Sequence, residues 1–198
     1  MNTKNERWIL ASGSPRREKL LQMLETPFEV IAADVEERAE STEPAAVTEE
    51  LSRQKAEAVA DGISEGIVIG ADTVVALDDK ILGKPASVEE AKDMLLSLQG
   101  RSHMVYTGVT IIKKEAGSSK QNVRTFSEGT RVHIAPVSMQ EIERYVATGD
   151  PMDKAGAYGI QGVFGRHIKG IEGDYYNVEG LPVHRLYEEM KRMGNIKF

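Results

Sequence analysis

The sequence contains no cysteine. Disulfides, thiolate metal sites and cysteine nucleophiles are therefore all excluded, and a reducing compartment fits this composition. Long hydrophobic runs are missing as well, because the longest apolar stretches, such as 109–112, fall far short of the ~20 residues that span a bilayer. Residues 1–8 are polar and lack the apolar segment of a signal peptide. We expect a cytoplasmic protein with no membrane partner.

Several common catalytic signatures are also absent. No two glycines have the G-x-G spacing of a dinucleotide-binding fingerprint, and there is no Walker A motif, no H-E-x-x-H and no G-x-S-x-G. The histidines, at positions 103, 133, 167 and 184, show no metal-ligand spacing. We interpret all of them as structural or surface residues.

Basic stripes, which non-specific binding to nucleic acid requires, are lacking. The net charge is −6, and segment 34–50 accounts for all of it, because this segment holds seven acids and one base. The rest of the chain is neutral. This balance argues against a nucleic-acid partner. It leaves room for a small phosphorylated ligand, which needs only a few well-placed cations.

The pattern that is present indicates an α/β domain. With 198 residues, of which 40% are hydrophobic, the chain is long enough for one substantial core. Strand and helix patterns alternate at first and then give way to hairpins, which predicts a mixed twisted sheet with flanking helices. We expect one domain over 1–198 that can divide into two lobes. Strands are predicted at 8–11, 28–32, 67–71, 74–77, 81–82, 105–112 and 123–134, and helices at 15–24, 44–61 and 183–193, with two more that follow Ser87 and Ser138 and end at Gly100 and Gly149.

The segment Ser12-Gly13-Ser14-Pro15-Arg16-Arg17 joins the first strand to the first helix. Ser14 suits the N-cap position and Pro15 the first helical position. The helix N-terminus offers free backbone N–H groups and a positive dipole end, and the serines and arginines add donors. This combination favours an anion site, most simply for phosphates. The alternative is a capped helix with two solvated arginines.

Acidic residues follow two of the predicted strands. Asp72 comes directly after 67–71, at the carboxyl end of an apolar strand, where open α/β sheets place ligands. A carboxylate there can hold Mg²⁺ or accept a proton from water, although it can also simply cap a turn. Glu36 and Glu37 follow the second strand, and one of them could complete a metal pair with Asp72. The alternative for them is a solvated acidic loop.

Two lysines are candidate phosphate contacts. Lys55 falls in the apolar stripe of helix 44–61, formed by Val47, Leu51 and Ala58, where snorkelling to the surface is the alternative. Lys84 lies in Gly83-Lys84-Pro85, a rigid turn that fixes its direction.

Taken together, these segments resemble one known family. Over about Leu10 to Leu186 the sequence is similar to the Maf proteins, nucleoside triphosphate pyrophosphatases first described as septum-formation inhibitors. The matching stretches are Leu10-Ala11-Ser12-Gly13-Ser14-Pro15-Arg16-Arg17, Gly70-Ala71-Asp72-Thr73-Val74-Val75, Gly83-Lys84-Pro85, Asp153-Lys154-Ala155-Gly156-Ala157-Tyr158-Gly159-Ile160-Gln161-Gly162, Gly173-Asp174-Tyr175-Tyr176 and Gly180-Leu181-Pro182.

The resemblance implies a fold related to the inosine triphosphate pyrophosphatases, with two lobes around a central cleft. It also implies hydrolysis of a nucleoside triphosphate between the α- and β-phosphates, dependent on a divalent cation such as Mg²⁺ or Mn²⁺, and a homodimer as a family-level expectation. The forms Gly-Ala-Asp-Thr and Ala-Tyr-Gly-Ile-Gln resemble the branch that acts on dTTP and UTP.

The resemblance assigns roles residue by residue. It implies that Asp72 is the proton acceptor and that Glu37 assists the metal or the water. The residues that would contact phosphates are Ser12, Arg16, Arg17, Lys55 and Lys84, and those that would select the base are Arg16, Thr73 and Gln161. Two other functions stay open: a nucleotide-sensing regulator of division without turnover, and a nucleotidyltransferase, for which the chain offers no acceptor domain.

Overall fold

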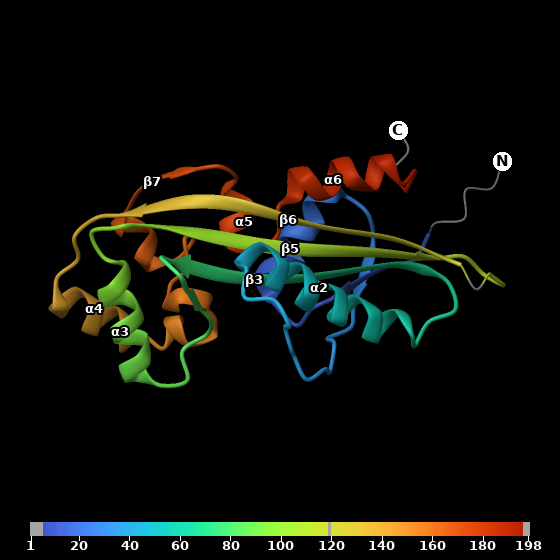
Figure 1. Cartoon of the computed structure of the whole chain (residues 1–198). Helices are drawn as coiled ribbons and strands as arrows, with labels where there is room; N and C mark the ends of the chain where they lie inside the picture. Colours follow the sequence, from blue (N-terminus) through green and yellow to red (C-terminus); the bar gives the residue numbers. More distant parts are fainter. Residues whose placement is uncertain (1–5, 119, 196–198) are drawn as a thin grey trace. The chain divides into compact units, whose positions relative to one another are not determined.

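The computed structural model describes residues 6–118 and 120–195. Residues 1–5, on which the expected absence of a signal peptide partly rests, lie outside this range. None of the described helices has the length and apolar character that crossing a membrane requires. The elements (Figure 1) are β1 (Trp8–Ala11), α1 (Pro15–Leu21), β2 (Phe28–Val30), α2 (Pro44–Ala60), β3 (Gly66–Leu77), β4 (Lys80–Leu82), α3 (Val88–Leu98), β5 (Ser102–Lys114), β6 (Gln121–Ile134), α4 (Met139–Val146), β7 (Ile168–Glu172), α5 (Tyr175–Glu179) and α6 (Val183–Arg192), with short 3-10 turns at Gln22–Leu24, Asp150–Asp153, Ala155–Ala157 and Val163–His167.

The described strands form one 7-stranded mixed sheet in the order β2-β1-β3-β5-β6-β7, with β4 paired to β3. β1 pairs in parallel with β2 and β3, whereas the β3–β4 and β6–β7 pairs are antiparallel. The α/β fold with a mixed sheet and flanking helices, expected from the sequence, is confirmed.

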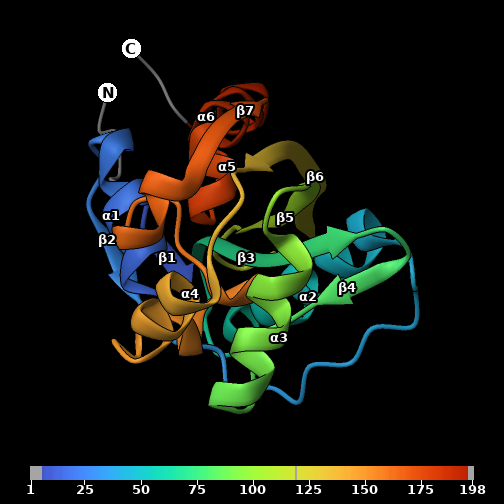
Figure 2. The same ribbon diagram turned by 90° about the vertical axis from the view of Figure 1, so that its left-hand side faces the viewer.

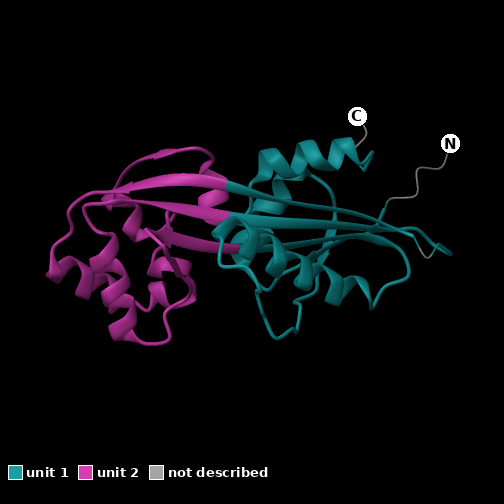
Figure 3. Cartoon of the chain, viewed as in Figure 1, with its two compact units in different colours: residues 1–72, 107–128, 180–198 teal, residues 73–106, 129–179 magenta. Residues whose placement is uncertain are grey.

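The chain divides into two compact units (Figure 3). Unit 1 comprises residues 1–72, 107–128 and 180–198, and unit 2 comprises residues 73–106 and 129–179. Strands β3, β5 and β6 each contribute residues to both units, so the boundary on β3 falls between Asp72 and Thr73. Most of the site residues predicted from the sequence belong to unit 1.

In unit 1, helices cover both faces of the strands, with α6 on one side and α2 on the other (Figure 1). Alternating residues of β3 face these two layers, as the period of a strand requires. Ile67, Ile69 and Ala71 pack in one cluster with α1 and α6, whereas Val68 packs in another with Ala56 and Val59 of α2. By the same alternation, Gly70 and Asp72 lie on the face that α2 covers.

Helix α2 approaches the sheet unusually closely at two glycines. A Cβ atom built on Gly70 would lie 2.3 Å from the carbonyl oxygen of Ser52, and one on Gly108 would lie 2.2 Å from that of Thr48. These distances are shorter than any real Cβ contact, so the helix backbone rests directly on the strands with no side-chain layer between them.

The buried face of α2 differs from the predicted stripe of Val47, Leu51 and Ala58. Val47 is buried, but Leu51 is half-buried and Ala58 is exposed, while Thr48, Ser52 and Ala56 are fully buried. The prediction chose large apolar residues, whereas close contact at the sheet glycines requires small ones. The hydroxyl groups are paired: Ser52 Oγ lies 3.0 Å from Thr110 Oγ1, and Thr110 Oγ1 lies 3.0 Å from Thr125 Oγ1.

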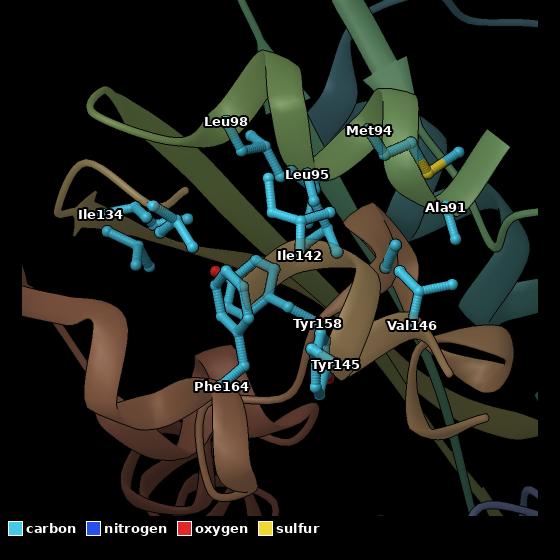
Figure 4. Packing of buried hydrophobic residues seen from close by; sticks show 14 of the residues in the cluster. Ala91, Met94, Leu95, Leu98, Ile134, Ile142, Tyr145, Val146, Tyr158 and Phe164 are labelled. Carbon is cyan, nitrogen blue, oxygen red and sulfur yellow. The ribbon is translucent and has the colours of Figure 1, made fainter. Parts of the chain in front are cut away.

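Unit 2 has its own hydrophobic core, in which α3 and α4 lie side by side (Figure 1 and Figure 2). Leu95 and Leu98 of α3 meet Ile142 and Tyr145 of α4, and Phe164 closes the cluster from the glycine-rich segment (Figure 4). Both helices start where the sequence predicted. Ser87 accepts the backbone N–H of Glu90, and Ser138 and Glu141 form a complete capping box. The glycine-rich segment 150–180 contributes Ala157, Tyr158 and Phe164 to this core.

Two predicted strands are a single strand in the structure. The stretches 67–71 and 74–77 join in β3, which runs through Asp72 and Thr73 without a break. The expectation that Asp72 ends a strand and could cap a turn is therefore wrong. The prediction ended the strand at Asp72 because an acid interrupts the apolar run. In the structure, an ion pair with Lys55 compensates the burial of the Asp72 carboxylate, so the strand continues. The second predicted strand, 28–32, is shorter than expected and ends at Val30.

Candidate active site

Asp72 is a buried carboxylate near the point where the neighbouring strand ends. The residue is 8% exposed. The last residue of β1, Ala11, is in register with Gly70, so Asp72 lies two residues beyond the end of its parallel neighbour. Asp72 therefore lies beyond the carboxyl end of its parallel neighbour β1, although β3 itself continues.

Three of the predicted site residues come together around one ammonium group. Lys55 Nζ lies 2.6 Å from Asp72 Oδ1 and 3.0 Å from Glu37 Oε1. The Lys55 and Asp72 side chains are 12% and 11% exposed, whereas that of Glu37 is 45% exposed. The snorkelling alternative for Lys55 is wrong, because its charged end points into the site. Of the two acids of the loop, Glu37 is the one that pairs with Lys55, whereas Glu36 pairs with the exposed Arg38.

The close contact of α2 with the sheet explains how Lys55 reaches Asp72. Ser52 and Ala56, whose backbone touches Gly70, flank Lys55 on the helix, and Asp72 follows Gly70 by two residues on the same face of β3. The missing side chain of Gly70 thereby makes room for α2.

The junction of β1 and α1 has the predicted form with a different capping contact. Ser14 is the N-cap residue and Pro15 the first helical residue, but the Ser14 side chain makes no capping bond. Instead the backbone N–H of Ser14 donates to Ser12 Oγ at 3.2 Å, and Arg17 Nη1 donates to the same oxygen at 3.3 Å. Ser12 is buried and thus organises the turn before the helix.

Arg17 links this junction to the segment before α6. Its Nε donates to the carbonyl oxygen of Gly180 at 2.8 Å. Burial lowers the pKa of the Arg17 guanidinium below its usual value, the negative charge of Asp72 opposes that change, Arg16 adds to it, and Glu37 opposes it. Arg16, Asp72 and Glu37 are thus its electrostatic neighbours. Unit 1 therefore combines a helix N-terminus, two arginines and a lysine-bridged carboxylate pair.

The remaining predicted residues belong to unit 2. Thr73 is half-buried and directly follows Asp72 on β3, while Lys84 and Gln161 are exposed on connecting segments. The Gly83-Lys84-Pro85 turn contacts the glycine-rich segment, because the N–H of Gly156 donates to the carbonyl oxygen of Gly83 at 3.1 Å. Gly156 has a φ of +66°, and a Cβ on it would lie 2.8 Å from Val75, so glycine is required there.

Sequence reasoning assigned no role to Lys154, which the structure buries beside Gln161. Lys154 is 8% exposed, and its Nζ donates to Asp150 Oδ1 at 3.0 Å and Asp153 Oδ1 at 2.6 Å. A Cβ on Gly159 would lie 2.9 Å from Lys154 Cε and 3.4 Å from Gln161 Oε1, so the lysine stem supports the turn that carries Gln161. The short spacing of Asp150 and Asp153 from Lys154 in the sequence is a signal that could have indicated these two ion pairs.

The residues present fit a divalent cation of the Mg²⁺ type. No cluster of three or more His, Cys, Asp or Glu side chains suited to a metal occurs in the described part of the chain. Mg²⁺, however, is commonly held by one or two carboxylates together with substrate phosphates and waters. Asp72 Oδ1 and Glu37 Oε1 approach the same nitrogen, so they lie no further apart than the sum of their two distances to it. Such a pair meets that requirement.

The protein is of the mixed α/β class and carries, in unit 1, two carboxylates beside a lysine and two arginines. Comparison with known proteins identifies its family. The family of Maf-like proteins matches residues 7–193. The chain belongs to the Maf family.

Relatives cover nearly the whole chain. A dTTP/UTP pyrophosphatase of Agathobacter rectalis is 50% identical over 200 residues, with 94% of this chain and 97% of the relative covered. Another, from Bacillus cytotoxicus, is 47% identical, with 96% and 97% covered. Among solved structures, the Staphylococcus aureus Ham1 protein matches with a TM-score of 0.53 and 16% identity, covering 95% of this chain and 100% of that protein. At this identity the likeness concerns the fold alone.

Proposed function

We propose that this protein hydrolyses dTTP and UTP to the corresponding monophosphate and pyrophosphate. The observation that carries the proposal is the Glu37–Lys55–Asp72 cluster, which shares its electrostatic surroundings with Arg16 and Arg17 at the start of α1. Membership of the Maf family and the names of the two relatives supply the substrate class and the bond that is cut.

In the proposed reaction, water attacks the α-phosphorus and Asp72 accepts its proton. Arg16 and Ser14, at the start of α1, bind phosphate oxygens. Arg17 and Ser12 hold the turn in shape and add donors to it. A bound Mg²⁺ or Mn²⁺, held by Glu37 and Asp72, would supply further positive charge for the phosphates. The reaction needs positioning and charge stabilisation rather than a covalent intermediate.

The other assigned residues act on the two ends of the substrate. Lys84, fixed by the Gly83–Gly156 contact, is a further phosphate ligand in this proposal. Gln161 and Thr73, with Arg16, select the base. The side-chain amide of Gln161 offers a donor and an acceptor, which uracil and thymine can both pair with through O4 and N3–H. A cytoplasmic location and a homodimer stay predictions.

The test is product analysis with a matched pair of variants. Purified protein is incubated with dTTP and Mg²⁺, and chromatography should show dTMP and pyrophosphate. Asp72→Asn should fold but lose ~10²–10⁴ in kcat, because an amide cannot accept the proton. Asp79→Asn, an exposed position in the turn after the same strand, should retain wild-type kcat.

Three outcomes would contradict the proposal. Release of diphosphate and orthophosphate would move the cleaved bond. Asp72→Asn activity within a few-fold of wild type would remove Asp72 from the mechanism. Tight binding of dTTP without any turnover would instead support a nucleotide-sensing regulator.

A further inference from the structure

The Lys55 ammonium points away from solvent and contacts the two carboxylates that would hold the metal in the proposed function. Its ammonium lies 2.6 Å from Asp72 Oδ1 and 3.0 Å from Glu37 Oε1, and its side chain is 12% exposed. Charge-assisted hydrogen bonds of this length are strong, because the partly buried setting screens them less than open solvent does. One positive charge thus serves two negative ones.

The helix that carries Lys55 is held firmly. Its backbone rests on Gly70 and Gly108, and Ser52, three residues before Lys55, joins the hydroxyl series with Thr110 and Thr125. The position of the Lys55 Cα is therefore set by the sheet. Only rotations about the side-chain bonds can move the ammonium away from the carboxylates.

Glu37 is held differently. It belongs to the segment between β2 and α2, which has no regular secondary structure, and its side chain is 45% exposed. Its ion pair with Lys55 draws this acidic loop toward Asp72. Lysine and a divalent cation therefore depend on the same two side chains, and their positive charges repel each other at such short range.

We propose that Lys55 is a built-in counter-ion for the Glu37–Asp72 pair, which a divalent cation must displace. This inference rests on the proposed function for the use of a divalent metal. The lysine keeps both carboxylates compensated and near each other, and thereby weakens binding of the metal alone. A triphosphate changes this balance, because its oxygens give the displaced ammonium new partners. Metal therefore enters tightly only together with the nucleotide.

The test measures Mn²⁺ binding to nucleotide-free protein by electron paramagnetic resonance, so it does not depend on turnover. Lys55→Met keeps the length of the stem and removes the charge, and it should bind Mn²⁺ at least tenfold more tightly than wild type. Lys55→Arg keeps the charge and should bind as weakly as wild type. Lys113→Met is the matched control, because Lys113 Nζ pairs with Glu6 Oε1 at 2.6 Å and its side chain is 18% exposed. This control should leave Mn²⁺ affinity unchanged. If Lys55→Met fails to fold in thermal melts, Lys55→Gln replaces it.

The results separate this inference from the proposed function. Unchanged or weaker Mn²⁺ binding in the uncharged variant overturns the counter-ion role, as does equal tightening in Lys55→Arg or in Lys113→Met. Absence of measurable Mn²⁺ binding in every variant overturns it too. Pyrophosphate release from dTTP by wild-type protein is scored independently, so that turnover without the expected Mn²⁺ shift refutes only the inference. A Mn²⁺ shift without turnover refutes only the function.

Discussion

Replacing Gly108 by alanine should disturb the site without touching any residue in it. The new Cβ would lie 2.2 Å from the carbonyl oxygen of Thr48 and 2.6 Å from the backbone nitrogen of Glu49. Ordinary contacts begin at 3.4 Å, so α2 must retreat by about 1 Å, since both obstacles are backbone atoms of a regular helix. Lys55 is carried on the same helix and moves with it.

The cost can be worked out in two parts. Overpacking of this kind destabilises a protein by about 1–3 kcal/mol. For a chain of this size that lowers the melting temperature by about 2–12 °C. The displacement also lengthens the 2.6 Å contact between Lys55 and Asp72, and a misplacement of about 1 Å can reduce kcat by ~10²-fold. We therefore expect a folded variant whose kcat falls about 10- to 100-fold.

Thermal melts and dTTP kinetics measured on the same preparation check this expectation. Gly170→Ala is the control, because Gly170 lies on β7 and a Cβ there would meet nothing within 4 Å. That variant should match wild type in both measurements. A lower melting temperature with unchanged kcat in Gly108→Ala would show that the seating of α2 does not position Lys55.

Three further outcomes are expected. Gln161→Ala should lower kcat/KM for dTTP more than for ATP, and an equal loss for both would remove Gln161 from base selection. Burial and the nearby charge of His133 lower the pKa of His103 from 6.5 to about 4. The folded state should therefore lose about 3 kcal/mol of stability as the pH falls from 6.5 to 4. In thermal melts at a series of pH values, His103→Gln should flatten this dependence, whereas a substitution at the exposed His184 should not. Glu189 is 1% exposed and is paired with three arginines at 2.7–2.9 Å, so Glu189→Gln should lower the free energy of unfolding, measured with urea, by about 1–3 kcal/mol. Glu188→Gln, which breaks the exposed pair with Lys191, should lower it far less.

Local signals in the sequence predicted much of the fold. The start of α2 at Pro44 and the starts of α3 after Ser87 and of α4 after Ser138 were predicted from neighbouring residues, and the structure confirms them. Each depends on chemistry within a few positions, such as a proline at the first helical position or a hydroxyl that accepts a nearby N–H.

The parts that sequence reasoning missed depend on contacts between distant residues. Asp72 was taken as a strand end because an acid seldom lies inside a buried strand, and only its pairing with Lys55, 17 positions earlier, makes that location stable. The buried face of α2 was placed on Leu51 and Ala58, since nothing local reveals that the opposing strands offer glycines. Lys55 was predicted to lie on the apolar stripe of this helix, but only the fold shows that its ammonium pairs with Asp72 and Glu37.

The glycines beneath α2 imply an unusual map of tolerance to mutation. Positions 70 and 108 touch no ligand in the proposed mechanism, yet every side chain would collide there with helix backbone. In a saturation library selected for activity, these two positions should therefore tolerate few replacements. Lys84 and Gln161 are exposed, so variants at these positions should fold normally and lose only activity. A position in this protein that tolerates few replacements therefore need not contact the substrate. Variants with altered substrate preference are best sought at positions where substitutions leave folding unaffected.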